Sequence, residues 1–204
     1  MCTRDEETKL TSQGFKCIVG GDECGTGTLA GPVTVCVCYV PPSVQIPGIN
    51  DSKKLSPKRR EALYDLLVKH PDVKYAIVHI GNDIIDQINI LQSRFEGFYQ
   101  AYLQLKKQVP DIDLVLLDGN QSPPQLAQEM KVHTIVGGDG LCYCIGAASI
   151  LAKVTRDRLM VEYDKQYPGY GLAGHKGYHT AQHVQRIQTL GSTPIHRKTF
   201  KGVK

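Results

Sequence analysis

The sequence predicts an α/β fold in which helices flank a mixed central sheet. Two short apolar strands come first as a hairpin, and later strand segments alternate with segments of helical periodicity. With 204 residues, of which 41% are hydrophobic, the chain suits one domain of ordinary size. We therefore expect a single domain over residues 1–204, with its core at about 18–200 and a flexible extension at 1–14.

The first half of the chain carries signals for three strands and a helix. Strands are predicted at residues 17–21, 33–40 and 74–80, where apolar and β-branched residues gather between turn signals. A glycine-rich turn joins the first two strands, and residues 41–50 form a loop. Ser56 is expected to cap a helix that ends near Leu67, because Pro57 suits the first helical position.

The second half predicts longer helices and two further strands. Residues 83–88 and 89–109 have helical periodicity, and Pro110 ends the second of these segments. Strands are expected at 114–117 and 132–136, followed by a long helix over 145–163 whose first turns are rich in small residues. A glycine-rich loop at 167–178 precedes a last helix, which Thr180 caps and which ends near Leu190.

Composition excludes some classes of protein. No apolar run approaches the ~20 residues of a membrane span, and residues 1–13 lack the apolar centre of a signal peptide. The seven cysteines include two C-x-C pairs but no C-x-x-C spacing, so Cys36 and Cys38 are interpreted as packing residues in a strand. A reducing compartment is the simplest interpretation, and we expect a cytoplasmic protein, with the nucleus not excluded.

The net charge of +4 is mild, but basic residues gather in two places. Such clusters are either solvated surface or contacts to a phosphate backbone. The early cluster is Lys53, Lys54, Lys58, Arg59 and Arg60, and the late cluster is Arg186, Arg197, Lys198, Lys201 and Lys204.

Four carboxylates follow three predicted strand ends: Asp22 with Glu23, then Asp118, then Asp139. An acid in such a position is often only a turn residue or a helix cap, as the turn dipeptide Asp118-Gly119 illustrates. If they converge, their mutual repulsion requires a hard cation, which implies Mg²⁺ or Mn²⁺. A carboxylate cluster with two such ions beside basic residues suits phosphodiester cleavage, and so indicates a nuclease.

Two other motifs are weaker. The run Gly25-x-Gly27-x-x-x-Gly31 is superficially similar to a dinucleotide-binding loop, but a predicted strand follows it instead of the helix that a pyrophosphate needs. What remains is a turn whose exposed backbone can approach a sugar or phosphate closely. His175, His179 and His183 are spaced by four, but Gly174 and Gly177 disfavour one shared helix, so surface or loop histidines are expected.

Several segments occur in the order of the motifs of ribonuclease HII, the type 2 ribonuclease H family, and the sequence resembles that family from about Ile18 to Phe200. These segments are Asp22-Glu23-Cys24-Gly25-Thr26-Gly27, Leu29-Ala30-Gly31-Pro32-Val33, Asn50-Asp51-Ser52-Lys53-Lys54-Leu55-Ser56, Ile88-Asn89-Ile90-Leu91, Leu117-Asp118-Gly119-Asn120, Ala147 to Arg158, Tyr167 to Gly171, His175-Lys176-Gly177-Tyr178 and Pro194-Ile195-His196-Arg197.

The resemblance implies a ribonuclease H-like fold and metal binding by Asp22, Glu23, Asp118 and, less directly, Asp139. It also implies that the Gly25 and Gly27 backbone groups and Tyr178 contact the ribose next to the cut. Lys53, Lys54 and Lys176 are candidates for phosphate contacts. Asp157 is a rival fourth ligand, but it lies about three turns into a helix between Arg156 and Arg158, so a structural ion pair is expected.

Two departures from the family pattern stand out. Thr26 replaces the arginine of the family's Gly-Arg-Gly, and Gly137 replaces a lysine before the fourth acid, so two cations are lost. Either loss could weaken substrate binding or alter the selectivity for the ribose.

The function expected from this resemblance is hydrolysis of the RNA strand of RNA/DNA hybrids, and cleavage at ribonucleotides embedded in duplex DNA, leaving 3'-hydroxyl and 5'-phosphate ends. Mg²⁺ or Mn²⁺ is the expected cofactor, and we expect activity as a monomer without membrane association. Two alternatives remain: a protein of the same fold that binds hybrids with weak or altered nuclease activity, and a nuclease acting on a different substrate such as a DNA junction.

Overall fold

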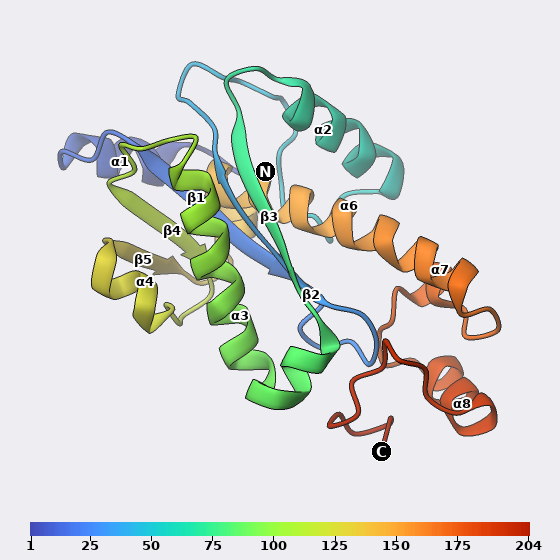
Figure 1. Ribbon diagram of the computed structural model, residues 1–204. Helices are drawn as coiled ribbons and strands as arrows, with labels where there is room; N and C mark the ends of the chain where they lie inside the picture. Colours follow the sequence, from blue (N-terminus) through green and yellow to red (C-terminus); the bar gives the residue numbers. More distant parts are fainter.

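The computed structural model describes residues 1–204 and contains one five-stranded mixed sheet (Figure 1). The strands are β1 (Ile18–Cys24), β2 (Val33–Tyr39), β3 (Lys74–Ile80), β4 (Leu114–Asp118) and β5 (Val132–Ile135). Their order across the sheet is β3-β2-β1-β4-β5. The hairpin strands β1 and β2 pair antiparallel, as do β2 and β3, whereas β4 runs parallel to both β1 and β5. The predicted mixed α/β architecture is therefore confirmed.

Eight helices accompany the sheet. They are α1 (Asp5–Ser12), α2 (Pro57–Lys69), α3 (Asn82–Lys106), α4 (Pro124–Glu129), α5 (Gly138–Leu141), α6 (Tyr143–Gln166), α7 (Leu172–His175) and α8 (Ala181–Leu190). Helix α3 covers one face of the sheet, and α2 and α6 cover the other, as Figure 1 shows. Helices α7 and α8 lie with the C-terminal segment beyond the start of β2, over a separate small apolar cluster.

The two-residue period of β2 divides the core into two layers. Val35 and Val37 pack with α3, whereas Cys36 and Cys38 point to the opposite face and pack with α2 and α6. Both cysteines are fully buried and free, which agrees with their interpretation as packing residues.

The start of α6 lies unusually close to β1. A Cβ atom added to Gly20 would come within 2.3 Å of the Cys144 carbonyl carbon, so only glycine fits there. The small residues that follow, from Gly146 to Ser149, are all buried. This close approach places the first turns of α6 directly behind the acidic end of β1.

The predicted helix boundaries hold where a side chain caps the helix. Ser56 accepts a hydrogen bond from the Arg59 amide, and Thr180 accepts one from the His183 amide. Helix α3 is broken at Asn89, which has a φ of 66° and whose Oδ1 accepts from the Leu91 amide. The break matches the two helical segments predicted on either side of this residue.

The N-terminal residues differ from the expected flexible extension. They form α1, and both Glu7 and Leu10 on this helix are buried. The segment is polar in composition, but hydrogen bonds to distant parts of the chain hold it in place. Helix α7 likewise lies inside the predicted loop at 167–178, and α4 and α5 are short additional turns.

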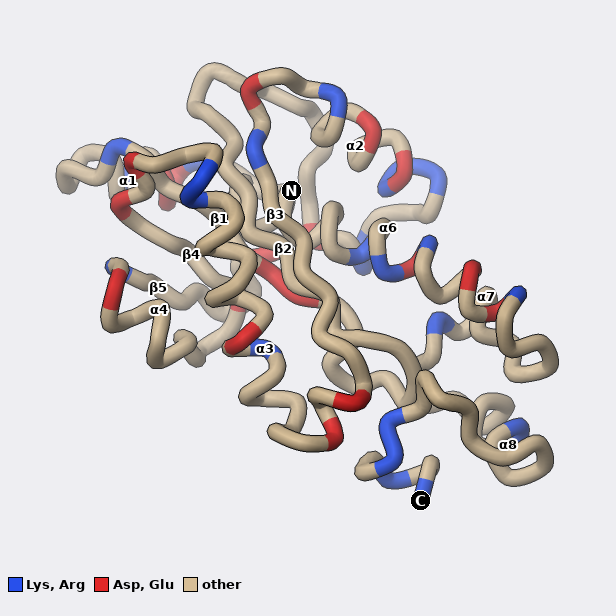
Figure 2. The backbone as a smooth tube through the Cα atoms, in the orientation of Figure 1, with Lys and Arg blue, Asp and Glu red and all other residues tan.

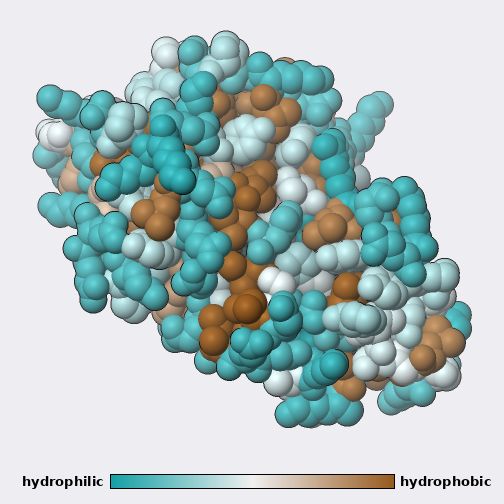
Figure 3. All heavy atoms as spheres, viewed as in Figure 1, coloured by the Kyte–Doolittle hydropathy of each residue, from teal (hydrophilic) through white to brown (hydrophobic).

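The surface is largely hydrophilic on the face shown in Figure 3, with apolar residues gathered in a strip across its middle. No helix combines the length and the apolar character that crossing a membrane requires.

Candidate active site

Three aspartates from separate elements converge at one edge of the sheet. Asp22 lies near the end of β1, Asp118 ends β4, and Asp139 lies on the short helix α5. The parallel pairing of Gly21 with Leu117 brings the next residues of both strands side by side. One carboxylate oxygen from each aspartate lies within 4.8 Å of those of the other two. Figure 2 shows the acidic end of β1 in the middle of the molecule, with basic residues along α6 to one side.

The electrostatics of this group favour a bound cation. Burial raises the pKa of Asp22 well above its usual range, and the charges of Glu23 and Asp118 raise it further. Burial and Asp118 also raise the pKa of Asp139, while Lys53 opposes the shift. In addition, Asp118 Oδ1 is buried without a hydrogen-bond partner. A divalent cation would relieve the repulsion and supply the missing partner, so these residues fit a metal site.

Glu23 belongs to the same acidic region but has a cationic partner of its own. Arg94 of α3 places its Nε 2.9 Å from Glu23 Oε1, and both side chains are largely buried. Burial raises the pKa of Glu23, and Arg94 opposes this shift. The second carboxylate oxygen, Oε2, is buried without a partner. No sequence signal identified Arg94, because it lies 71 positions from Glu23 and outside both basic clusters.

The first two lysines of the early basic cluster, Lys53 and Lys54, have different neighbours. Lys53 Nζ lies 3.3 Å from Asp139 Oδ2, so it contacts the acidic group directly. Lys54 Nζ lies 3.7 Å from Asp51 Oδ2 instead. Both lysine side chains are mostly exposed, and each can therefore reach a ligand at the surface.

Two fully buried arginines support the glycine turn between β1 and β2. Arg197 donates to the carbonyls of Gly25, Thr26 and Gly31. Arg156 donates to the Pro32 and Ala30 carbonyls, the Thr28 hydroxyl and the Lys176 carbonyl. Arg197 therefore does not belong to an exposed basic cluster, because its guanidinium donates hydrogen bonds to backbone carbonyls inside the protein.

Tyr178 reaches the same turn from the segment after α7. Its backbone pairs with Thr28, and its hydroxyl lies 3.9 Å from Cys24 Sγ. The residue is 38% exposed. Burial raises the pKa of Tyr178 to about 12, so the hydroxyl keeps its proton at neutral pH and can donate a hydrogen bond.

Lys176 lies two residues before Tyr178 in a left-handed conformation, with a φ of 52°. Its ammonium donates to the Ala173 carbonyl, and its carbonyl accepts from Arg156. It also lines a surface cavity together with Arg60, Lys153 and Tyr178.

Asp157 lies apart from the three clustered aspartates. It forms ion pairs with Lys153, at 2.7 Å, and with Arg60, at 3.6 Å. It therefore forms ion pairs within the structure, as expected, although its partners are not the neighbouring arginines.

The histidines do not form a metal site. His175 and His183 stack with ring centroids 4.3 Å apart, and His183 Nε2 lies 3.1 Å from Nε2 of His196. His196 Nδ1 accepts from the Thr193 amide, which leaves its Nε2 to donate to His183. His183 Nδ1 then donates to the Tyr178 carbonyl, so this buried pair supports the backbone of Tyr178.

Comparison with known proteins identifies the family. The family model for ribonuclease HII matches residues 19–203. The chain belongs to the ribonuclease HII family. It is 47% identical to the ribonuclease HII of Endomicrobium trichonymphae over 192 residues, which cover 94% of this chain and 89% of that protein. It is 45% identical to the ribonuclease HII of Geotalea uraniireducens, covering 97% and 88% of the two chains.

Solved structures agree with this assignment to the ribonuclease HII family. The ribonuclease H2 of Pyrococcus horikoshii superimposes with a TM-score of 0.74 at 26% identity, over 92% of this chain and 95% of that one. The ribonuclease HII in a complex with PCNA from Archaeoglobus fulgidus superimposes with a TM-score of 0.71 at 22% identity, over 91% and 96% of the two chains. The fold is therefore the ribonuclease H-like fold, and the protein is a metal-dependent endonuclease that hydrolyses RNA in RNA/DNA hybrids.

Proposed function

We propose that Asp22, Asp118 and Asp139, with Glu23 beside them, hold the catalytic Mg²⁺ or Mn²⁺ ions. The observation that carries this proposal is the convergence of three carboxylates within 4.8 Å in a partly buried place. The partnerless oxygens of Asp118 and Glu23 support it, because a buried acceptor without a donor is costly unless a cation occupies it. Bound divalent ions would activate a water and stabilise the leaving oxygen.

The protein's own residues would arrange the substrate around this centre. Lys53, which contacts Asp139, and Lys54 next to it are placed to neutralise a phosphate that approaches the carboxylates. Lys176 would also contact the phosphate backbone, because it lines a cavity with other basic side chains.

Recognition of the ribose is assigned to the glycine turn and Tyr178. Selectivity for RNA needs a group that contacts the 2'-hydroxyl, because metal ions grip any phosphodiester. The turn formed by Gly25, Thr26 and Gly27 exposes its backbone and is held by two buried arginines. The Tyr178 hydroxyl lies next to Cys24, the residue before this turn. Gly27 is exposed and has open space around it, which would let a sugar approach closely.

The substrates in this proposal are RNA/DNA hybrids and duplex DNA with an embedded ribonucleotide, cut to 3'-hydroxyl and 5'-phosphate ends. All of the acids come from one chain, which supports action as a monomer. No observation favours a protein that binds hybrids without cutting them. A DNA junction nuclease would have no use for Tyr178 as a ribose contact.

The test offers three substrates: a hybrid, a duplex with one ribonucleotide and a plain DNA duplex, each with Mg²⁺, Mn²⁺ or chelator. We expect cleavage of the first two only, and only with metal. Asp118→Asn should lower the rate by roughly 10²-fold or more while hybrid binding persists, since a metal-holding charge is lost but the basic side chains remain.

The matched control is Asp72→Asn, which removes one negative charge from an exposed turn before β3. This turn lies beside Tyr39, the last residue of β2, whereas Thr34 and His79 pair near the other end of that strand. It should cleave like the wild type. Near-normal turnover by a folded Asp118→Asn variant would contradict the assignment of the metal site.

A further inference from the structure

The N-terminal strap, defined here as residues 2–10, contacts the part of the metal centre that the sheet does not hold. Asp22 and Asp118 lie on paired strands, but Asp139 lies on α5, a helix of only four residues. Glycines occupy positions 137, 138 and 140 around it, and Gly137 has a φ of 70°. A single turn with this composition has little intrinsic stability, so its position depends on contacts from elsewhere.

The first residues of the strap contact α5 and the residues after it. The Cys2 thiol donates to the carbonyl of Asp139 itself, at 3.1 Å, in a buried contact. The Thr3 amide donates to the Leu141 carbonyl, and the Thr3 carbonyl accepts from the Tyr143 amide. Cys2 and Thr3 thus hold every second residue from Asp139 to Tyr143.

Glu7 fixes the start of α6, directly after this turn. Its Oε1 accepts from the Cys144 amide at 2.9 Å, and the residue is only 7% exposed. The residue in the N-cap position of α6, Cys142, makes no side-chain capping bond. Glu7 therefore supplies, from a distant part of the chain, both the acceptor and the negative charge that a helix N-terminus favours.

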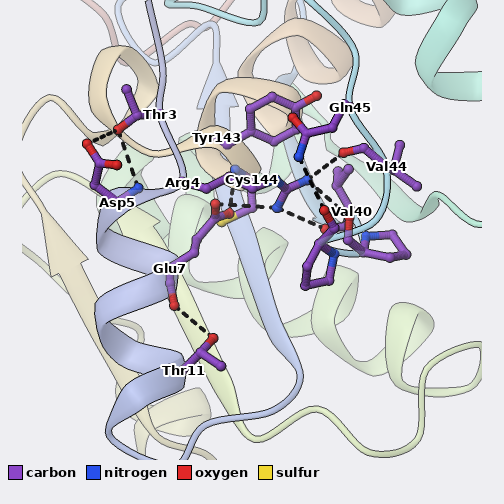
Figure 4. Close-up of polar contacts among 12 residues, drawn as sticks. Thr3, Arg4, Asp5, Glu7, Thr11, Val40, Val44, Gln45, Tyr143 and Cys144 are labelled. Carbon is purple, nitrogen blue, oxygen red and sulfur yellow. Dashed lines mark hydrogen bonds and ion pairs between the residues drawn. The ribbon is translucent and has the colours of Figure 1, made fainter.

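Arg4 anchors the strap to the loop after β2. It forms an ion pair with Glu7 at 3.4 Å, lies 4.1 Å above the Tyr143 ring, and donates to the carbonyls of Val40, Pro41 and Val44. Figure 4 shows Arg4 between Glu7 and this loop, with Tyr143 and Cys144 on the adjoining helix. The strap is therefore held at several points from Cys2 to Glu7.

We propose that the N-terminal strap is a positioning element of the metal centre, which sets the place of Asp139 relative to Asp22 and Asp118. The inference rests on the proposed role of these aspartates in metal binding. Cys2 and Glu7 are positioning residues, since neither touches the substrate or an ion. Loosening the strap allows α5 to move, and residues that orient a metal ligand typically affect metal affinity by roughly 10- to 100-fold.

The experiment measures Mn²⁺ affinity by isothermal titration calorimetry, and separately the dependence of cleavage rate on Mn²⁺ concentration. Glu7→Ala is expected to raise the Kd by roughly 10-fold or more, with the rate recovering at high Mn²⁺. Glu7→Gln, which keeps an acceptor for the Cys144 amide, should restore much of the affinity. Glu6→Ala is the matched control, because Glu6 lies in the same first turn but its side chain is 40% exposed and pairs only with Lys9.

A double-mutant cycle tests whether the effect passes through Asp139. In an Asp139→Asn background, Glu7→Ala should cause no further loss of Mn²⁺ affinity, whereas two independent effects would add. Additive losses would overturn the inference, as would a folded Glu7→Ala variant with the Kd of the wild type.

Two further measurements keep the outcome clear. If Glu7→Ala does not fold, Cys2→Ala tests the inference instead, because it removes only the thiol that donates to the Asp139 carbonyl. A Cys2→Ala variant with the Mn²⁺ Kd of the wild type would then overturn the inference. The wild type and Asp118→Asn are titrated in parallel. Failure of the wild type to bind Mn²⁺ would contradict the proposed metal site, whereas normal binding by the wild type and by the strap variants would contradict the strap alone.

Discussion

Gly25 and Gly27 lie on the same turn, yet the structure predicts opposite results when each is changed to alanine. Gly25 has a φ of +92°, and a Cβ atom there would lie 2.1 Å from Arg156 Nε. Gly27 has no such backbone requirement, and nothing lies within 4 Å of its added Cβ. Gly25→Ala should therefore damage the fold, whereas Gly27→Ala should leave the fold intact.

The expected magnitude for Gly25→Ala follows from two costs. A left-handed alanine costs roughly 1–2 kcal/mol. The clash adds more, because Arg156 is fully buried and cannot move without breaking bonds to carbonyls such as those of Pro32 and Ala30. Disrupting the partners of a buried charge costs about 3–5 kcal/mol. A loss of roughly 4 kcal/mol would lower the Tm of a chain of this size by roughly 8–16 °C.

The assay is thermal unfolding followed by circular dichroism, combined with cleavage of a duplex that carries one ribonucleotide, at a temperature where both variants are folded. Gly27→Ala should melt with the wild type but show a raised KM, because its methyl group stands where we propose that the ribose approaches. A Gly25→Ala variant that melts within about 2 °C of the wild type, or a Gly27→Ala variant that loses as much stability, would refute this reasoning.

Three further predictions concern the same region. Tyr178→Ala should lose far more activity on a single ribonucleotide than on a continuous hybrid, where neighbouring riboses offer other registers; equal losses with a lower Tm would indicate a packing role. Thr26→Arg should tighten hybrid binding and steepen its salt dependence, and an unchanged slope would show that this side chain faces away from the substrate. Burial lowers the pKa of His183 from 6.5 to about 4, so the stability that its neutral form contributes is present above pH 6.5 and is lost as the pH falls towards 4. His183→Gln should flatten the dependence of the unfolding free energy on pH over this window, and an identical dependence in both proteins would contradict the prediction.

Local rules were sufficient to predict most of the secondary structure. The strand at 74–80 matches β3, because its flanking turns and its apolar residues lie next to one another in the sequence. The caps Ser56 and Thr180 were predicted for the same reason, since each bonds an amide only three residues away. The convergence of Asp22 and Asp118 was also predictable, because parallel strands bring their carboxyl ends to one edge of the sheet.

Other features depended on packing between distant segments. Arg156 and Arg197 appear in the sequence as ordinary basic residues, yet both are buried and hold the glycine turn, at separations of 124 to 172 positions. The partnership of Glu23 with Arg94 and that of Glu7 with the Cys144 amide are equally remote. Sequence periodicity records which face of an element is apolar, so it determined the elements of this protein. The partner of a buried charge is set by which segments meet in the folded chain, so only the tertiary structure decided what supports the acids and the turn.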